Sequence, residues 1–184
     1  MKSRYALCLA LMVAATGSQA SEFDLNLSDD SANASVTITP ANRSIDFGAG
    51  YIYQEGGTHI ANLDFHARGR TAIGNLPTTV GIGAQFNWFD EDPVDGGAIG
   101  IGGFTRINIP TVPGLGVNLS AYYAPSITSF GDADHFYRWD ANLTYRIIQN
   151  ADVYLGYREV RVDLEHASYI TLNDGLIAGF TIHF

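Results

Sequence analysis

Apolar and polar residues alternate with a period of two over most of this chain. In residues 175–184 every second position is apolar, and the positions between are mostly glycine, threonine or histidine. Residues 135–148 show the same split, which no helical period reproduces. Because successive side chains of a β-strand point to opposite faces, the pattern predicts strands with one apolar face and one polar or small face.

The alternation recurs in enough segments to predict a complete barrel. Eight segments carry it clearly: 44–53, 59–68, 78–89, 99–109, 117–125, 135–148, the strand from 151, and 175–184. Two shorter runs before residue 44 predict a first hairpin. Repeated strands of about ten residues with one apolar face are typical of transmembrane β-barrels. We predict an all-β, antiparallel, up-and-down transmembrane β-barrel, with ten strands favoured and eight as the alternative.

A soluble β-sandwich or lipocalin-like fold would also alternate, but it would bury its large aromatic residues in one core. The barrel instead turns Trp88, Trp139 and Phe180 outward to lipid. It also predicts an aromatic girdle near the outer strand ends, formed by Tyr51, Tyr53, Trp88, Tyr123, Tyr137 and Tyr157.

Two kinds of connection alternate along the chain. We expect tight periplasmic turns at 40–43, 69–77, 110–116 and 149–150, and looser, more acidic outer loops at 54–57, 90–97, 126–134 and 165–174. In the strand from 151 the apolar positions change parity after Tyr157. We interpret this change as a one-residue β-bulge near Arg158 or Glu159 that switches the apolar face.

The first 20 residues have the composition of a secretory signal peptide. Lys2 and Arg4 precede an apolar run over 5–15, and small residues stand at the cleavage position, Ser18-Gln19-Ala20. The run is shorter than the roughly 20 residues that a membrane-spanning helix needs. We therefore predict a cleaved signal peptide over 1–20, a barrel domain over 21–184, and location in a bacterial outer membrane.

Charge and cysteine content narrow the range of partners. Removal of Lys2 and Arg4 leaves 8 basic residues against 19 acidic ones, a net charge of −11, which disfavours nucleic acid. Cys8 leaves with the signal peptide, so the mature chain has no thiol. No zinc-type histidine spacing, phosphate loop or dinucleotide motif occurs, and we expect no cofactor.

We expect a monomer whose partners are outer-membrane lipid, lipopolysaccharide and the barrel-assembly machinery. That machinery would recognise the C-terminal signal formed by Phe180, Ile182 and Phe184.

Short aromatic motifs in the second half of the chain resemble a known family. The segments are Tyr122-Tyr123-Ala124-Pro125, Tyr145-Arg146 and Leu155-Gly156-Tyr157-Arg158. They are similar to the Tyr-Tyr-x-Pro and Gly-Tyr-Arg runs of the YfaZ family of small bacterial outer-membrane proteins. The resemblance implies an outer-membrane β-barrel and supplies no catalytic residues.

Inward-facing positions carry charges of both signs. The predicted lumen network consists of Asp46, Asp64, His66, Arg68, Arg106, Arg138, Asp140, Asn142, Arg146, Asp152 and Arg158. Small barrels are filled by their side chains, so these charges must pair or meet water. A filled or narrow lumen predicts a structural or surface role, and a small channel for ions or solutes is the alternative.

Two weaker candidates for chemistry lie in outer loops. One loop contains four carboxylates, those of Asp90, Glu91, Asp92 and Asp95, which could hold Ca²⁺. Acidic loops are usually only solvated, so we expect no metal. His166 and Ser168 resemble the His-x-Ser pair of lipid A deacylases of the PagL type, but Ile177 stands about where that family has its orienting acid, and Asp174 or Glu165 is the alternative for that role. We therefore expect no enzyme activity, with an acyl hydrolase as the alternative.

Overall fold

The computed structural model describes residues 20–40, 44–164 and 169–184. These residues form ten long strands, one short strand and a single turn of 3-10 helix. The long strands are β1 (Ala20–Leu27), β2 (Ser31–Thr39), β3 (Ile45–Gln54), β4 (Thr58–Ile73), β5 (Leu76–Glu91), β6 (Val94–Asn108), β7 (Leu115–Ala124), β9 (Ala133–Ile148), β10 (Ala151–Leu164) and β11 (Ile170–His183). Between β7 and β9 lie η2 (Ser126–Thr128) and β8 (Ser129–Gly131).

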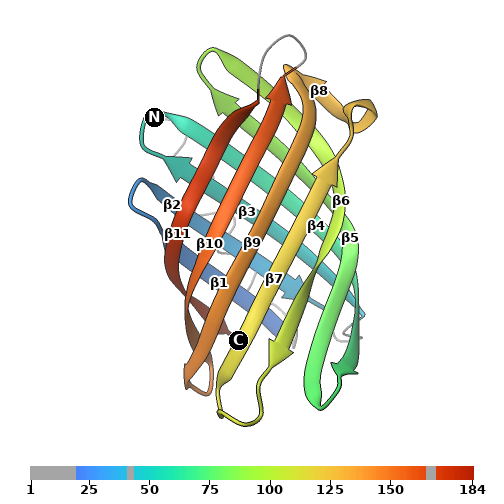
Figure 1. The fold of residues 1–184 in the computed structure, drawn as a ribbon, viewed down its shortest axis with the longest axis vertical. Coiled ribbons are helices and arrows are strands. Elements are labelled where there is room, and N and C mark those ends of the chain that lie inside the picture. Colours follow the sequence, from blue (N-terminus) through green and yellow to red (C-terminus); the bar gives the residue numbers. More distant parts are fainter. Residues whose placement is uncertain (1–19, 41–43, 165–168) are drawn as a thin grey trace.

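The long strands close into an antiparallel barrel (Figure 1). Each pairs with its neighbours along the chain, β7 pairs with β9, and β1 pairs with β11 to complete the ring. The short β8 adds to the edge of β6. The prediction of an up-and-down antiparallel barrel is confirmed, and the first hairpin belongs to the wall, so the strand number is ten.

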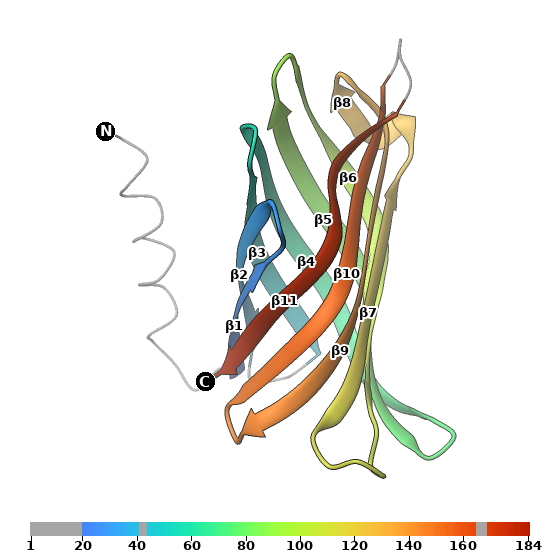
Figure 2. The same ribbon diagram turned by 60° about the vertical axis from the view of Figure 1, so that its left-hand side comes forward.

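The two ends of the barrel differ in construction (Figure 2). One end, called the near end, holds Ser21 and Phe184, whose backbones exchange two hydrogen bonds of 2.7 and 2.9 Å. The opposite end, called the far end, carries the β3–β4 and β5–β6 turns and β8. The strands also differ in length, since β1 has 8 residues and β5 has 16.

The outside of the barrel is apolar and the inside is largely polar. Ile82 and Leu176 are each 70% exposed, whereas Asn87, at an inward position, is fully buried. Trp88, Trp139 and Phe180 are also exposed, as a barrel requires and a soluble sandwich core does not. Among the described residues, no helix is long and apolar enough to cross a bilayer.

Two predicted loops are wrong because the strands continue through them. The pairing of β4 with β5 runs on to Ile73 and Leu76, so the turn expected at 69–77 shrinks to two residues that include Gly74 with φ of 60°. A two-residue hairpin turn favours such left-handed backbone, which glycine adopts without strain. The loop expected at 90–97 shrinks in the same way, because Glu91 pairs with Val94.

The predicted face switch near Arg158 or Glu159 is also wrong. Arg158, Val160 and Val162 are all buried and lie on the same, inward face of β10. The pairing of β10 with β11 shifts register only after Val160, where β11 holds one extra residue, Leu172. The apolar pattern changes parity because the barrel interior itself becomes apolar toward the far end.

Candidate functional site

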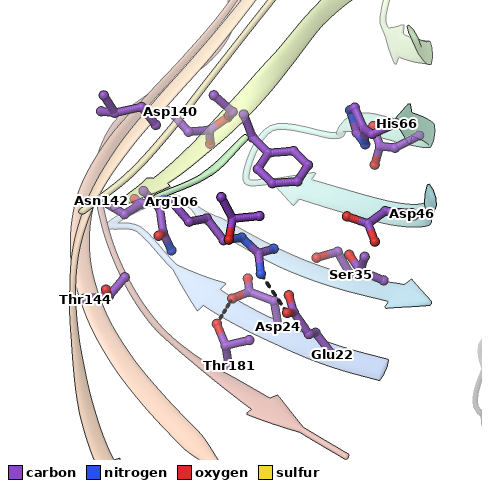
Figure 3. Close-up of a pocket in the computed structure, with 18 of the residues that line it drawn as sticks. Glu22, Asp24, Ser35, Asp46, His66, Arg106, Asp140, Asn142, Thr144 and Thr181 are labelled. Carbon is purple, nitrogen blue, oxygen red and sulfur yellow. Dashed lines mark hydrogen bonds and ion pairs between the residues drawn. The ribbon is translucent and has the colours of Figure 1, made fainter. Parts of the chain in front are cut away.

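A cavity of about 510 Å³ occupies the barrel interior (Figure 3). All eleven residues predicted for the lumen network contribute to its lining: Asp46, Asp64, His66, Arg68, Arg106, Arg138, Asp140, Asn142, Arg146, Asp152 and Arg158. Sequence reasoning left out further lining residues that the alternation places on the same face: Glu22, Asp24, Asn33, Tyr122, Tyr154 and His183. The parity of β1 and β2 could have found the first three.

Two buried arginines share one carboxylate. Asp140 on β9 accepts hydrogen bonds from Arg158 Nε at 2.7 Å and from Arg138 Nε at 3.4 Å. Ser120 Oγ donates to the same carboxylate at 3.1 Å. Strand register explains the assembly, because Asp140 lies directly opposite both Arg158 on β10 and Ser120 on β7. One acid therefore neutralises two buried guanidinium groups only in part.

A second group links β2, β3 and β4. Arg68 donates to Asp46 Oδ1 at 3.0 Å, and Thr39 Oγ1 donates to the same atom at 2.7 Å. On β4, His66 Nε2 lies 2.7 Å from the hydroxyl of Tyr122 across the barrel. The contact between His66 and Tyr122 ties opposite walls together through the lumen, whereas the contacts of Asp46 join neighbouring strands.

One ion pair crosses the cavity. Arg106 on β6 reaches Glu22 on β1, with Nη1 and Oε1 2.6 Å apart (Figure 3). His183 lies 3.6 Å from the same carboxylate and 3.0 Å from Asp152. Asp152 in turn accepts two hydrogen bonds from Arg146, of 2.8 and 3.2 Å. The near end of the interior is thus a linked set of charges around the opening.

Two lining carboxylates receive hydrogen bonds from neutral donors. Asp24 accepts from Tyr154 and Thr181, each at 2.7 Å, and from Asn26 at 2.9 Å. Asp64 accepts from Gln85 at 2.5 Å and from Asn62 at 2.9 Å. Neither carboxylate has a cationic partner within ion-pair distance among the described residues.

Inward glycines make room for these side chains against the wall. A Cβ on Gly48 would stand 2.7 Å from Asp64 Oδ2, and a Cβ on Gly156 would stand 1.8 Å from Asn142 Oδ1. Each glycine faces its large neighbour across a strand pair. The missing side chains therefore let Asp64 and Asn142 lie flat, which keeps the centre of the barrel open.

Apolar side chains fill the far end of the interior. This far-end cluster, defined by ten buried residues, consists of Ile52, Ile60, Phe89, Ala98, Ala124, Ala133, Phe136, Val160, Val162 and Leu172. Val94, Leu164 and Ile170 pack against it. Sequence reasoning missed the cluster because it treated inward positions as polar.

The remaining candidates form no site that the structure shows. Within the described ranges, no group of three or more His, Cys, Asp or Glu side chains is arranged to hold a metal ion, and this includes the acidic β5–β6 turn. His166 and Ser168 lie outside the described residues, as does the signal peptide except for Ala20. Phe180, Ile182 and Phe184 are exposed on the outer face at the near end.

A closed antiparallel barrel that is apolar outside and polar within is a transmembrane β-barrel protein. The chain belongs to the YfaZ family, because the family model described as YfaZ precursor matches residues 1–184. The resemblance seen in the aromatic motifs is thereby confirmed. No curated protein matches the chain.

The solved structures that match this fold are distant from the chain in sequence. The outer membrane channel DcaP of Acinetobacter baumannii is 9% identical with a TM-score of 0.42, and the match covers 88% of this chain and 54% of DcaP. The outer membrane protein Omp33 of A. baumannii is 11% identical with a TM-score of 0.35, over 90% of this chain and 96% of Omp33. A chain from a study of in-meso crystallization of membrane proteins is 12% identical with a TM-score of 0.49, over 90% of this chain and 83% of that one. This chain thus spans about half the length of DcaP.

Proposed function

We propose that this protein is an integral outer-membrane barrel of structural or surface role, whose interior does not let ions or solutes pass from one side of the membrane to the other. An even strand number places both chain ends at one side of the membrane, which we assign to the periplasm. The far end, with its acidic turns, then faces outward, toward lipopolysaccharide. The apolar outer face of β11, ending at Phe184, is the surface offered to the barrel-assembly machinery.

The far-end cluster carries the proposal. An ion that crosses the barrel must lose its water among the residues of this cluster, of which Phe89, Phe136 and Leu172 are fully buried. Apolar constrictions block conduction by excluding water, and an unpaired charge in such surroundings costs several kcal/mol. The interior is therefore a cavity that is closed at the far end and opens at the near end.

Conductance in planar bilayers tests the closed interior. We expect no steady current from the purified protein, and a measurable current from the double variant Phe89→Ser with Phe136→Ser, which introduces polar groups into the cluster. The matched control is Phe86→Ser, which changes an exposed phenylalanine on the outer face of β5. Heat-modifiable mobility in detergent gels verifies that each variant is folded. Steady current from the unmodified protein contradicts the proposal and favours the small channel.

We also propose that the barrel has no acyl-hydrolase activity. Ile177 stands about where lipid A deacylases of the PagL type have an acid that orients the histidine, so the sequence supplies no carboxylate for His166 at that position. Purified protein mixed with lipid A should release no fatty acid. Release that disappears in Ser168→Ala would overturn this part of the proposal.

A further inference from the structure

We propose that the near-end cavity binds a small solute that carries a protonated amine. The inference deepens the proposed function and rests on it, because an interior closed at the far end is a pocket rather than a path. Three observations on the lining support it: unused hydrogen-bond acceptors, an excess of negative charge inside the opening, and a suitable size.

The unused acceptors come from two sides of the barrel. Asn33 Oδ1 on β2 and Gln85 Oε1 on β5 are buried and accept no hydrogen bond from any described residue. Asn33 is only 4% exposed and Gln85 only 3%, and both line the cavity. Buried polar atoms are almost always hydrogen-bonded, so these oxygens call for a donor from a solute or from water. Both are acceptors, so a suitable solute donates.

The charges select the kind of donor. Over the whole lining, six arginines face six acids. Two of the arginines lie at the opening, where Arg70 is exposed and Arg146 pairs with Asp152. Deeper inside, four arginines then face five acids when the histidines are neutral.

The deeper excess can be traced to particular residues. Asp24 and Asp64 are the acids held by neutral donors, while Asp140 is shared by two arginines. A carboxylate without a counter-charge is costly to bury, and an ammonium group nearby removes that cost. The excess of one negative charge favours a cationic donor over a neutral hydroxyl.

The cavity and its opening limit the solute. A volume of about 510 Å³ lies within the roughly 300–1,000 Å³ range of pockets that bind small molecules. The exposed guanidinium groups of Arg70 and Arg146 at the opening disfavour compounds with several positive charges. A singly charged amine with a few heavy atoms fits both conditions.

Calorimetric titration of the detergent-solubilised protein tests the inference with two probes of equal size. Ethanolamine and ethylene glycol differ only in that an ammonium group replaces one hydroxyl. We expect saturable binding of ethanolamine and at least tenfold weaker binding of ethylene glycol. Equal affinity for the two probes, or no saturable binding of ethanolamine, overturns the proposal.

Matched variants locate the site. Asp64→Asn should weaken ethanolamine binding at least tenfold, whereas Glu55→Gln, an equal change of charge at an exposed far-end turn, should leave it unchanged. Asn33→Asp adds a negative charge to the cavity and should tighten binding, which keeps the test decisive if Asp64→Asn does not fold. An unaltered affinity in both cavity variants contradicts the site.

The same preparation separates this inference from the closed interior on which it rests. A protein without current and without ethanolamine binding would refute the amine site alone. A protein with steady current would refute the closed interior, whichever probe it binds.

Discussion

The two halves of the barrel interior are built on the same wall but filled in opposite ways. Toward the near end, inward positions hold paired charges around a cavity, whereas toward the far end they hold the tightly packed far-end cluster. On β10 the change takes place between Arg158 and Val160, two residues apart on one face. The direction of a side chain is therefore set by strand parity, while its polarity depends on its height in the barrel.

The two fillings should respond differently to mutation. An ion-pair network depends on each member, because removal of one partner leaves another charge buried without compensation. An apolar cluster tolerates changes that conserve volume and loses stability as cavities form. Free energies of unfolding, measured by urea titration in lipid or detergent, can separate these behaviours.

The largest effect is expected at Asp140. Asp140→Ala leaves the guanidinium groups of Arg138 and Arg158 buried without their carboxylate, so the free energy of unfolding should fall by about 3–5 kcal/mol. Glu55→Ala, which removes an exposed carboxylate from a far-end turn, should change it by less than about 0.5 kcal/mol. Equal losses in the two variants would mean that the inner charges are solvated, and the contrast between the halves would disappear.

A somewhat smaller loss is expected at Leu172 in the far-end cluster. Leu172→Ala removes a fully buried side chain and should cost about 2–5 kcal/mol, depending on how far the cluster collapses around the cavity. Leu172→Met, which nearly conserves volume, should cost less than about 1.5 kcal/mol. Leu176→Ala on the outer face of the same strand is the matched control, and a loss there as large as that at Leu172 contradicts tight packing of the cluster.

The sequence was sufficient for the parts of the structure that depend on local alternation. It predicted the strands, their number and the inward direction of residues such as Arg68 and Asp140. It did not predict the far-end cluster, because Val160 and Val162 look like outward residues when the interior is assumed to be polar. It also could not pair Arg106 with Glu22, since residues 84 positions apart meet only through the closure and tilt of the barrel.

The turns show the same limit. Gly74 and Pro93 predict longer loops, because glycine and proline are frequent in loops. Pairing across the neighbouring strands extends regular structure almost to both residues. Cross-strand hydrogen bonds, which the local sequence does not reveal, decide where a strand ends.

Packing around the cavity can be tested at a glycine. Gly156→Ala places a methyl group 1.8 Å from Asn142 Oδ1 and 2.5 Å from the carbonyl oxygen of Ala141, so it should destabilise the barrel by about 1–3 kcal/mol. Gly69→Ala is the control, because a Cβ there has no heavy atom within 4 Å, and its effect should be close to zero. A neutral Gly156→Ala would show that Asn142 moves freely and that the cavity lining is not fixed.

The smallest effect is expected at the opening of the cavity, where charges meet water. Arg146 is 53% exposed and holds Asp152 through two hydrogen bonds, so it resembles a surface ion pair more than the buried pairs of Asp140. Arg146→Met keeps the aliphatic stem and should cost only about 0.2–1 kcal/mol. The difference should shrink further in about 1 M salt, where the screening length falls to roughly 3 Å. A loss comparable to that of Asp140→Ala, unchanged by salt, would show that the near end is as dry as the interior behind it. The cavity would then have no opening to water.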